Sequence, residues 1–291
     1  MDSGTMKFTI RVPSDRALES ESVILPIASK SGAIRHTLCV SSQVGCAMQC
    51  AFCETAQMGF LANLSVEQII SQWFVARFHF RVPISNIVFM GMGEPMENLD
   101  AVLHAVRIFA DQNGPAVAPS RITISTVGRI QGILRLTEFA RTPGFHRIRL
   151  AVSVNAPNDE IRSSLMPVNR SAPLAELFAA MKRFTDEYAR RVLIEYVLIP
   201  GVNDADEHAD ELADRLRTLP CTINLIPYNL RRHSPWPAPE ESVVERFYRR
   251  LQASGHRVTR RLTLGRSVMA ACGQLGNEHI RRRKFVPLTA M

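Results

Sequence analysis

The chain has 291 residues, 46% of them hydrophobic, and its 35 basic and 27 acidic residues give a net charge of +8. This length supports one sizeable core and is common for a single α/β barrel, and six cysteines are too few for a disulfide scaffold. No run approaches eighteen apolar residues and the first residues lack the apolar core of a signal peptide, so we expect a cytoplasmic protein without membrane contact.

The first predicted elements are two strands, at 7–12 and 22–27, which alternate between apolar and polar residues. Pro13 begins the segment that separates them, so we expect a hairpin that closes one end of a barrel. A third strand is predicted at 36–41.

A helix is predicted downstream of the cysteine-rich segment that follows this strand. Ser65 with Gln68 three residues later has the pattern of a capping box, in which each side chain bonds the backbone of the other residue. The apolar face of this helix is predicted to consist of Ile69, Ile70, Trp73, Phe74 and Phe78.

The rest of the chain alternates between strand-like and helical patterns. Strands are predicted at 84–90, 121–126, 148–154, 192–199, 222–226 and 257–263, and helices at 99–112, 130–141, 173–190, 206–218 and 241–254. Such alternation indicates a parallel sheet with right-handed crossovers. We therefore expect an α/β fold, a curved partial (β/α)6 barrel with its site at the C-terminal strand ends. The expected domains are an N-terminal hairpin extension (1–35), the barrel (36–264) and a C-terminal extension (265–291).

Three cysteines, Cys46, Cys50 and Cys53, form a C-x3-C-x2-C triplet with no fourth cysteine close in sequence. Three thiolates leave one coordination position free. A structural zinc site is closed by four ligands, whereas an iron–sulfur cluster held by cysteines can keep one iron open to a cofactor. Two alternatives remain: His36 or His79 completes a zinc site, or the cysteines are small buried hydrophobes.

Further motifs accompany the triplet: CVSSQVGC at 39–46, GMGEP at 91–95 and AACGQL at 270–275. The triplet, with an aromatic residue before its last cysteine, resembles the cluster loop of radical S-adenosylmethionine (SAM) enzymes. The whole set resembles the RlmN/Cfr family of RNA adenine methyltransferases over about residues 21–275. The resemblance implies a [4Fe-4S] cluster on the three triplet cysteines, with the amino and carboxylate groups of SAM bound to the free iron.

By the same resemblance, residues that follow the predicted strands bind SAM. Glycine lets the backbone approach a ligand closely, and Gly93 with Glu94 is expected at the SAM amino group. The other implied contacts are Ser125, Ser153, Asn155 and Asn229. Asn155 stands where the family usually has histidine, which removes a titratable group but keeps hydrogen-bonding capacity.

Three more residues are implied in the chemistry. Cys272 takes a methyl group from one SAM, and a second SAM is cleaved to a 5′-deoxyadenosyl radical that abstracts hydrogen from the S-methyl group. The carbon radical adds to the adenine ring, Glu21 removes the ring proton, and Cys39 attacks the Cys272 sulfur to release the product. The alternative is that both cysteines are core thiols and Glu21 is an ordinary acid at a strand start.

The C-terminal part of the chain is strongly basic. From Arg246 onward there are eleven lysines and arginines and one acid, Glu278. Solvated helices usually mix both signs, so we expect this segment to contact RNA. The expected partners are ribosomal RNA, with tRNA as a further candidate, and an electron donor such as flavodoxin or ferredoxin.

The sequence departs from the family pattern at 53–56, which reads CETA instead of CATG, and at 264–269, which reads LGRSVM instead of RGDDID. The helical RNA-binding domain that precedes the barrel in RlmN is also expected to be absent. Two other interpretations therefore stay open: a SAM- and cluster-binding RNA-binding or regulatory protein, and a radical SAM enzyme for a protein or small molecule. Neither of these two interpretations needs the Cys39 and Cys272 pair, so we expect methylation of an adenine ring carbon. Carbon 2 is expected ahead of carbon 8.

Overall fold

The computed structural model describes residues 4–14, 17–28, 32–261 and 269–277. Its strands are β1 (Met6–Val12), β2 (Leu18–Ala28), β3 (Ile34–Cys39), β4 (Gln43–Gly45), β5 (Phe60–Asn63), β6 (Ile84–Phe89), β7 (Ile122–Thr126), β8 (Arg149–Ser153), β9 (Val192–Leu198), β10 (Cys221–Pro227) and β11 (Val258–Arg260). Its α-helices are α1 (Glu54–Gln57), α2 (Val66–Phe74), α3 (Leu99–Ala110), α4 (Ile130–Phe139), α5 (Asp159–Leu165), α6 (Leu174–Tyr188), α7 (Asp206–Leu216) and α8 (Glu241–Ala253). A π-helical turn, η1 (Val75–His79), continues α2, and short 3-10 turns are η2 (Pro95–Asn98), η3 (Pro119–Arg121) and η4 (Pro167–Arg170).

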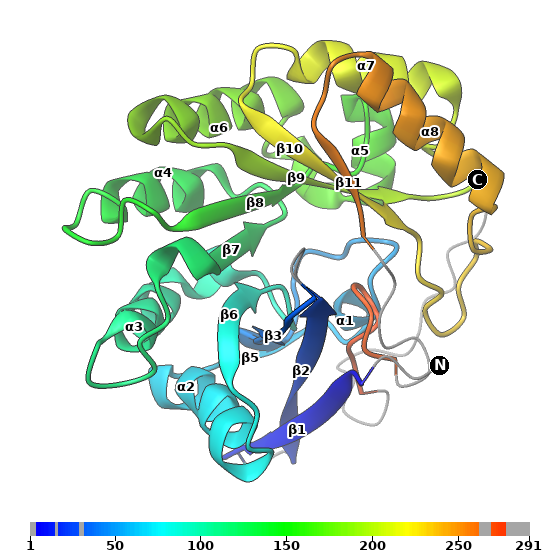
Figure 1. The fold of residues 1–291 in the computed structure, drawn as a ribbon. Coiled ribbons are helices and arrows are strands. Elements are labelled where there is room, and N and C mark those ends of the chain that lie inside the picture. Colours follow the sequence, from blue (N-terminus) through cyan, green and yellow to red (C-terminus); the bar gives the residue numbers. More distant parts are fainter. Residues whose placement is uncertain (1–3, 15–16, 29–31, 262–268, 278–291) are drawn as a thin grey trace.

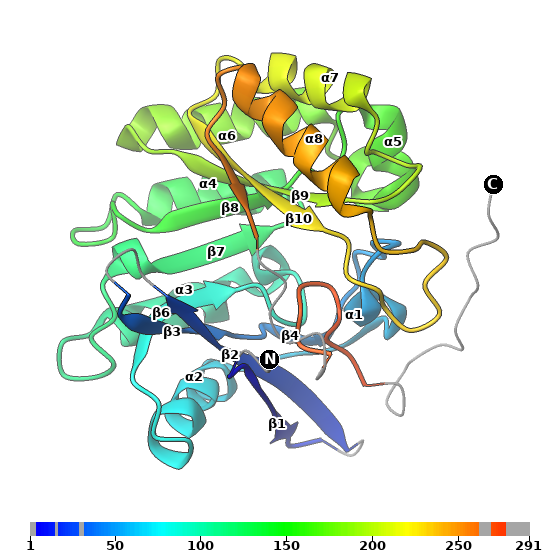
Figure 2. The same ribbon diagram turned by 45° about the vertical axis from the view of Figure 1, so that its right-hand side comes forward.

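Within the described residues the main sheet has nine strands in the order β1-β2-β3-β6-β7-β8-β9-β10-β11. The strands from β3 to β11 are parallel, and the β1–β2 hairpin joins β3 through antiparallel pairing. The sheet curves into an open barrel with helices along its outer side (Figures 1 and 2). The predicted α/β partial barrel with an N-terminal hairpin is confirmed. The part of the last predicted strand beyond Arg261 lies outside the described residues.

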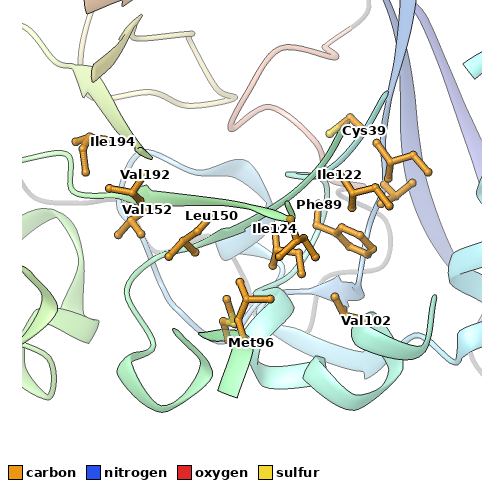
Figure 3. Packing of buried hydrophobic residues seen from close by; sticks show 14 of the residues in the cluster. Cys39, Phe89, Met96, Val102, Ile122, Ile124, Leu150, Val152, Val192 and Ile194 are labelled. Carbon is orange, nitrogen blue, oxygen red and sulfur yellow. The ribbon is translucent and has the colours of Figure 1, made fainter. Parts of the chain in front are cut away.

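The core forms where the sheet meets these helices, because each strand directs alternate apolar residues outward. Phe89 of β6, Ile124 of β7 and Leu150 of β8 are almost fully buried, and Figure 3 shows them along neighbouring strands with Val102 of α3 beside them. Cys39, the last residue of β3, belongs to the same core. A continuous apolar layer therefore holds the strand ends that carry the site.

The predicted start of α2 is confirmed. The Ser65 hydroxyl accepts the Gln68 amide at 3.3 Å, and the Gln68 side chain accepts the Ser65 amide at 2.8 Å. The predicted apolar face was wrong at its end. Ile69 is buried, but Phe74 and Phe78 are more than half exposed. Phe74, five residues after Ile69, falls on the opposite side of a helix with 3.6 residues per turn, and Phe78 follows it on η1.

None of the described helices is long and apolar enough to cross a membrane.

Candidate functional site

A cavity of about 150 Å³ lies at the carboxyl ends of the parallel strands and is called the inner cavity here. Parallel strands bring the residues that follow them to one edge of the sheet, so segments far apart in sequence meet there. Nine of the predicted site residues line it, namely Cys50, Cys53, Gly93, Glu94, Ser125, Ser153, Asn155, Asn229 and Cys272. Cys39, Cys46 and Glu21 do not line it.

The loop with the cysteine triplet leaves the small β4–β5 sheet and enters α1. Gly45 has φ +71°, and a Cβ atom there would lie 1.8 Å from the Gly59 carbonyl oxygen, so only glycine fits. The same carbonyl accepts the amide of Cys46 at 3.0 Å, and the amide of Ala51 donates to the Leu165 carbonyl at 2.9 Å. These bonds fix both sides of the loop.

The three triplet thiols fit a metal cluster by their chemistry. Burial raises the pKa of each thiol, and the pKa of Cys50 is raised further by Cys53 and Cys46. Thiolates held this way need a nearby positive charge, which a metal supplies. In the described part of the chain, no three metal-binding side chains converge on a single ion. Three thiols in one loop, with no fourth cysteine close in sequence, suit an iron–sulfur cluster that keeps one iron open better than a structural zinc site closed by four ligands.

The GMGEP segment follows β6 and needs its glycines. A Cβ atom on Gly91 would lie 2.7 Å from the Val40 carbonyl oxygen, and one on Gly93 would lie 2.5 Å from the Gln43 Cβ atom. Glu94 is buried, and its carboxylate accepts the amides of Met96 at 3.0 Å and Val127 at 2.8 Å. Burial raises the pKa of Glu94 to about 7 despite these two bonds. This carboxylate suits a cationic ligand group.

The predicted residues on β7 and β8 contribute in different ways. Ser125 and Ser153 line the inner cavity at the ends of their strands. Asn155 adopts a left-handed backbone with φ +57°, and its amide oxygen accepts the Val197 amide at 2.9 Å. Its carbonyl accepts the Asn203 side chain at 2.7 Å. Asn155 therefore ties β8 to β9 as well as lining the cavity.

Cys272 lies on the segment 269–277, which crosses the barrel mouth beside α1 and β2 (Figure 2). The Gly273 carbonyl accepts the Glu54 amide at 2.7 Å, and the Gly276 amide donates to Glu21 Oε2 at 2.9 Å. The Asn229 side chain donates to the Cys272 carbonyl at 3.3 Å. Three parts of the barrel thus position this cysteine.

Cys39 and Glu21 lie behind the cavity wall. Burial raises the pKa of Cys39 to about 12, and Cys272 is the next cause of this rise. Cys272 is thus near enough to Cys39 for its charge to raise the pKa of the Cys39 thiol. Glu21 is buried on β2, with Lys7 3.5 Å from its Oε1, and its bond to Gly276 holds the segment that carries Cys272.

A second cavity, the outer cavity, of about 480 Å³, shares part of its lining with the inner cavity. Its walls include Leu25, Pro26, Ile27 and Ala28 of β2 together with Arg260, Ala270 and Ala271. Ile226, Asn229, Arg261 and Cys272 line both cavities. Cys272 therefore stands in the partition between a chamber lined by Cys50, Cys53 and Glu94 and a largely apolar chamber.

Sequence reasoning missed Glu195 and Arg261, which both line the inner cavity. Glu195 Oε2 accepts the Asn224 side chain at 2.8 Å and lies 3.9 Å from Arg261 Nη1. Burial raises the pKa of Glu195, which Arg261 partly offsets. In the sequence, Glu195 is the one acid within the apolar strand predicted at 192–199, and this could have marked it as a candidate site residue.

Arg162 of α5 was also missed. Its side chain is fully buried and donates to the carbonyls of Val154 at 3.1 Å, Val127 at 2.6 Å and Ser153 at 3.2 Å, and to Asn169 Oδ1 at 2.7 Å. Burial lowers its pKa to about 10, so it stays charged at neutral pH. One guanidinium therefore joins the ends of β7 and β8 to α5, which also bonds the cluster loop.

Most of the described arginines of the basic C-terminal part are paired with acids. Arg246 and Arg250 of α8 bond Asp206 and Asp210 of α7. Arg249 pairs with Glu245, and Arg260 pairs with Glu241. The sequence count missed this pairing because all four acids precede Arg246. The remaining cluster, 281–284, lies outside the described residues.

Comparison with known proteins agrees with this geometry. The family model of the radical SAM superfamily matches residues 40–213. A probable dual-specificity RNA methyltransferase RlmN 1 of Protochlamydia amoebophila is 47% identical over 283 residues, covering 97% of this chain and 76% of that protein. The dual-specificity RNA methyltransferase RlmN of Alkalilimnicola ehrlichii is 42% identical over 94% of this chain and 74% of its own length.

The fold is shared with a solved relative as well. The crystal structure of a radical SAM methyltransferase from Sphaerobacter thermophilus matches with a TM-score of 0.85 and 41% identity, over 93% of this chain and 76% of that chain. The family-model match, residues 40–213, includes the cysteine triplet and the ends of β6, β7, β8 and β9. The chain therefore belongs to the radical SAM superfamily and, within it, to the RlmN family, and it is a radical SAM methyltransferase.

Proposed function

We propose that this enzyme methylates a carbon of an adenine ring in RNA, carbon 2 in ribosomal RNA, with tRNA as a further substrate. The observation that carries the proposal is the position of Cys272 in the partition between the two cavities. A carrier that collects a methyl group on one side and delivers it on the other needs this position. The named activity of the two RlmN relatives supports RNA as the acceptor.

The inner cavity is the proposed SAM site. Cys46, Cys50 and Cys53 would hold a [4Fe-4S] cluster, and Glu94 would accept hydrogen bonds from the ammonium group of SAM. When bound, cluster and SAM supply a 5′-deoxyadenosyl radical, a chemistry that side chains cannot provide. The protein's own part is to hold Cys272 against this cavity, through the bonds of its segment to Asn229, Glu54 and Glu21.

The two thiols supply the release step. The Cys39 thiolate attacks the Cys272 sulfur, and a disulfide replaces the bond between that sulfur and the transferred carbon. The electron pair of the broken bond stays with the carbon and takes a proton, which leaves a methyl group on the ring. Glu21 is the proposed acceptor of the ring proton, and this role requires that Gly276 first release its carboxylate. An external thiol then reduces the disulfide.

The outer cavity is the proposed site of the acceptor base. Its largely apolar walls suit a planar ring. A base inside a helix cannot reach Cys272, so it must be single-stranded or flipped out.

Flavodoxin or ferredoxin is the proposed electron donor.

Mass spectrometry of RNA nucleosides from cells with and without the gene tests this proposal. We expect a methyladenosine with its methyl group on a ring carbon, present only with the gene, and absent again when Cys272 is replaced by alanine. Identical nucleosides in both strains would contradict RNA methylation.

A further inference from the structure

The segment that carries Cys272 (residues 269–277, called the Cys272 segment here) rests on α1, which directly follows the cysteine triplet. In addition to the backbone bond between Glu54 and Gly273, the Thr55 hydroxyl donates to the Leu275 carbonyl at 2.5 Å. These bonds join the carrier of the methyl group to the end of the triplet loop.

A buried ion pair adds to this contact. Glu54 is 1% exposed, and its Oε1 lies 3.4 Å from Nη1 of Arg232, in the segment after β10. The same nitrogen donates to the Gly276 carbonyl at 3.1 Å. A Cβ atom on Gly276 would lie 3.1 Å from the Glu54 Cγ atom, so the side chain of Glu54 packs against this glycine. Both members of the ion pair therefore contact Gly276.

Gly276 is also the residue that covers the proposed base. Its amide donates to Glu21 Oε2 at 2.9 Å, and this bond must open before the carboxylate can accept a proton from the ring. Arg232 thus holds the carbonyl of the same glycine whose amide holds Glu21. Movement of the Cys272 segment away from Glu21 has to break the bond to Arg232 or take Arg232 with it.

Position 54 is one at which this chain departs from the family pattern, since CETA replaces CATG at 53–56. The alanine of that pattern cannot form an ion pair with Arg232. A carboxylate at a buried position loses its hydration, so it is tolerated where a partner such as this guanidinium compensates for the loss. The ion pair is therefore a feature of this chain beyond the pattern that it shares with the family.

We propose that Glu54 and Arg232 form a latch that holds the Cys272 segment against α1 and keeps Gly276 on Glu21 until the segment moves. Arg232 makes the contact with the segment, and Glu54 acts through Arg232 by orienting its guanidinium. Neither residue lines the inner or the outer cavity, so both are positioning residues. This inference rests on the proposed function, in which Cys272 carries the methyl group and Glu21 accepts the proton.

Hydrogen–deuterium exchange of the Gly276 amide tests the latch, in anaerobically reconstituted protein without SAM or RNA. The exchange rate follows the equilibrium by which the segment opens. Arg232→Met removes a bond from a charged donor and should raise the rate about 10-fold. Glu54→Gln keeps the volume but removes the charge, so it should give a smaller rise. The double variant should match Arg232→Met, because Glu54 acts through Arg232.

Arg141→Met is the matched control, since it breaks an ion pair with Glu187 on α6 and should leave the exchange of Gly276 at the wild-type rate. A second readout is the amount of 5′-deoxyadenosine formed for each methylated nucleoside during turnover with RNA. This ratio should rise in Arg232→Met, because a loosened segment presents Cys272 less often. Poor folding would lower both products together and would leave the ratio unchanged.

Wild-type exchange of Gly276 in Arg232→Met would overturn the latch, and so would a double variant in which the two effects multiply. Faster exchange with an unchanged product ratio would overturn the positioning role. The exchange measurements need neither SAM nor RNA. Absence of RNA methylation by the wild-type protein would therefore contradict the proposed function separately from the latch.

Discussion

Cys50 is the residue on which the metal assignment can be tested most simply. Its thiol is buried beside the other two triplet cysteines and lines the inner cavity. We expect Cys50→Ala to yield no 5′-deoxyadenosine from SAM, while its far-ultraviolet circular dichroism stays that of wild type, because the loop lies outside the main sheet. Cys221→Ala removes a buried thiol from β10, away from the cavity, and should keep SAM cleavage. Full cleavage by Cys50→Ala would contradict the cluster assignment.

Glu94 gives a prediction on pH. Burial raises its pKa from 4.5 to about 7, so on raising the pH the unfolded chain releases this proton before the folded chain does. The carboxyl group therefore lowers the stability of the fold progressively as the pH rises from about 4.5 to about 7. In cofactor-free protein, the free energy of unfolding of wild type relative to Glu94→Gln should fall by about 3 kcal/mol between pH 4 and pH 8. Urea unfolding at both pH values measures it, and a pH-independent difference would contradict the buried, shifted carboxyl.

At the scale of elements, α5 links the ends of β7 and β8 at the inner cavity to the loop with the cysteine triplet, through Arg162 and Leu165. Arg162→Met should leave several buried carbonyl oxygens without donors and should cost about 3 kcal/mol or more in urea unfolding. Arg135→Met is the matched control, since its ion pair with Asp100 is exposed and should contribute well under 1 kcal/mol. Equal small losses in both variants would show that Arg162 does not join these elements.

The pairing between α7 and α8 bears on where RNA binds. Because Arg246 and Arg250 are neutralised by Asp206 and Asp210, reversing the charge of Arg250 should leave the salt dependence of RNA binding unchanged. Reversing Arg281, Arg282 and Arg283 should flatten the log–log salt slope by about 0.7 for each lost contact with single-stranded RNA. Filter binding over a salt series measures both. A flatter slope only in the Arg250 variant would place the RNA on α8 instead.

The alternation of strands and helices was enough to predict the parallel sheet. The two-residue repeat of a strand and the 3.6-residue repeat of a helix can each be recognised within one short segment of sequence. The sequence did not reveal β4, β5 or α5, because these elements are short and are fixed by partners elsewhere. Gly45, for example, depends on Gly59, and Arg162 bonds a carbonyl 35 residues away. Glu195 likewise lies beside Asn224 of β10 and Arg261, which directly follows β11, and neither neighbour is visible from the strand pattern alone. Motif spacing located the residues of the inner cavity, while contacts between distant elements had to come from the structure.

For the whole molecule, the central claim is that Cys272 carries the methyl group between the two cavities and Cys39 releases the product. Cys39 is needed only for release, whereas Cys272 is needed for transfer, so their alanine variants should fail in different ways. Two thiols that serve only packing would give small stability losses in both variants and unchanged chemistry.

The most direct measurement is the intact mass of Cys39→Ala after turnover with substrate RNA, before and after nuclease treatment. We expect a covalent RNA adduct on Cys272 that nuclease trims to a nucleotide remnant, and neither adduct nor methylated RNA from Cys272→Ala. Normal turnover by Cys39→Ala, with no adduct, would contradict the account.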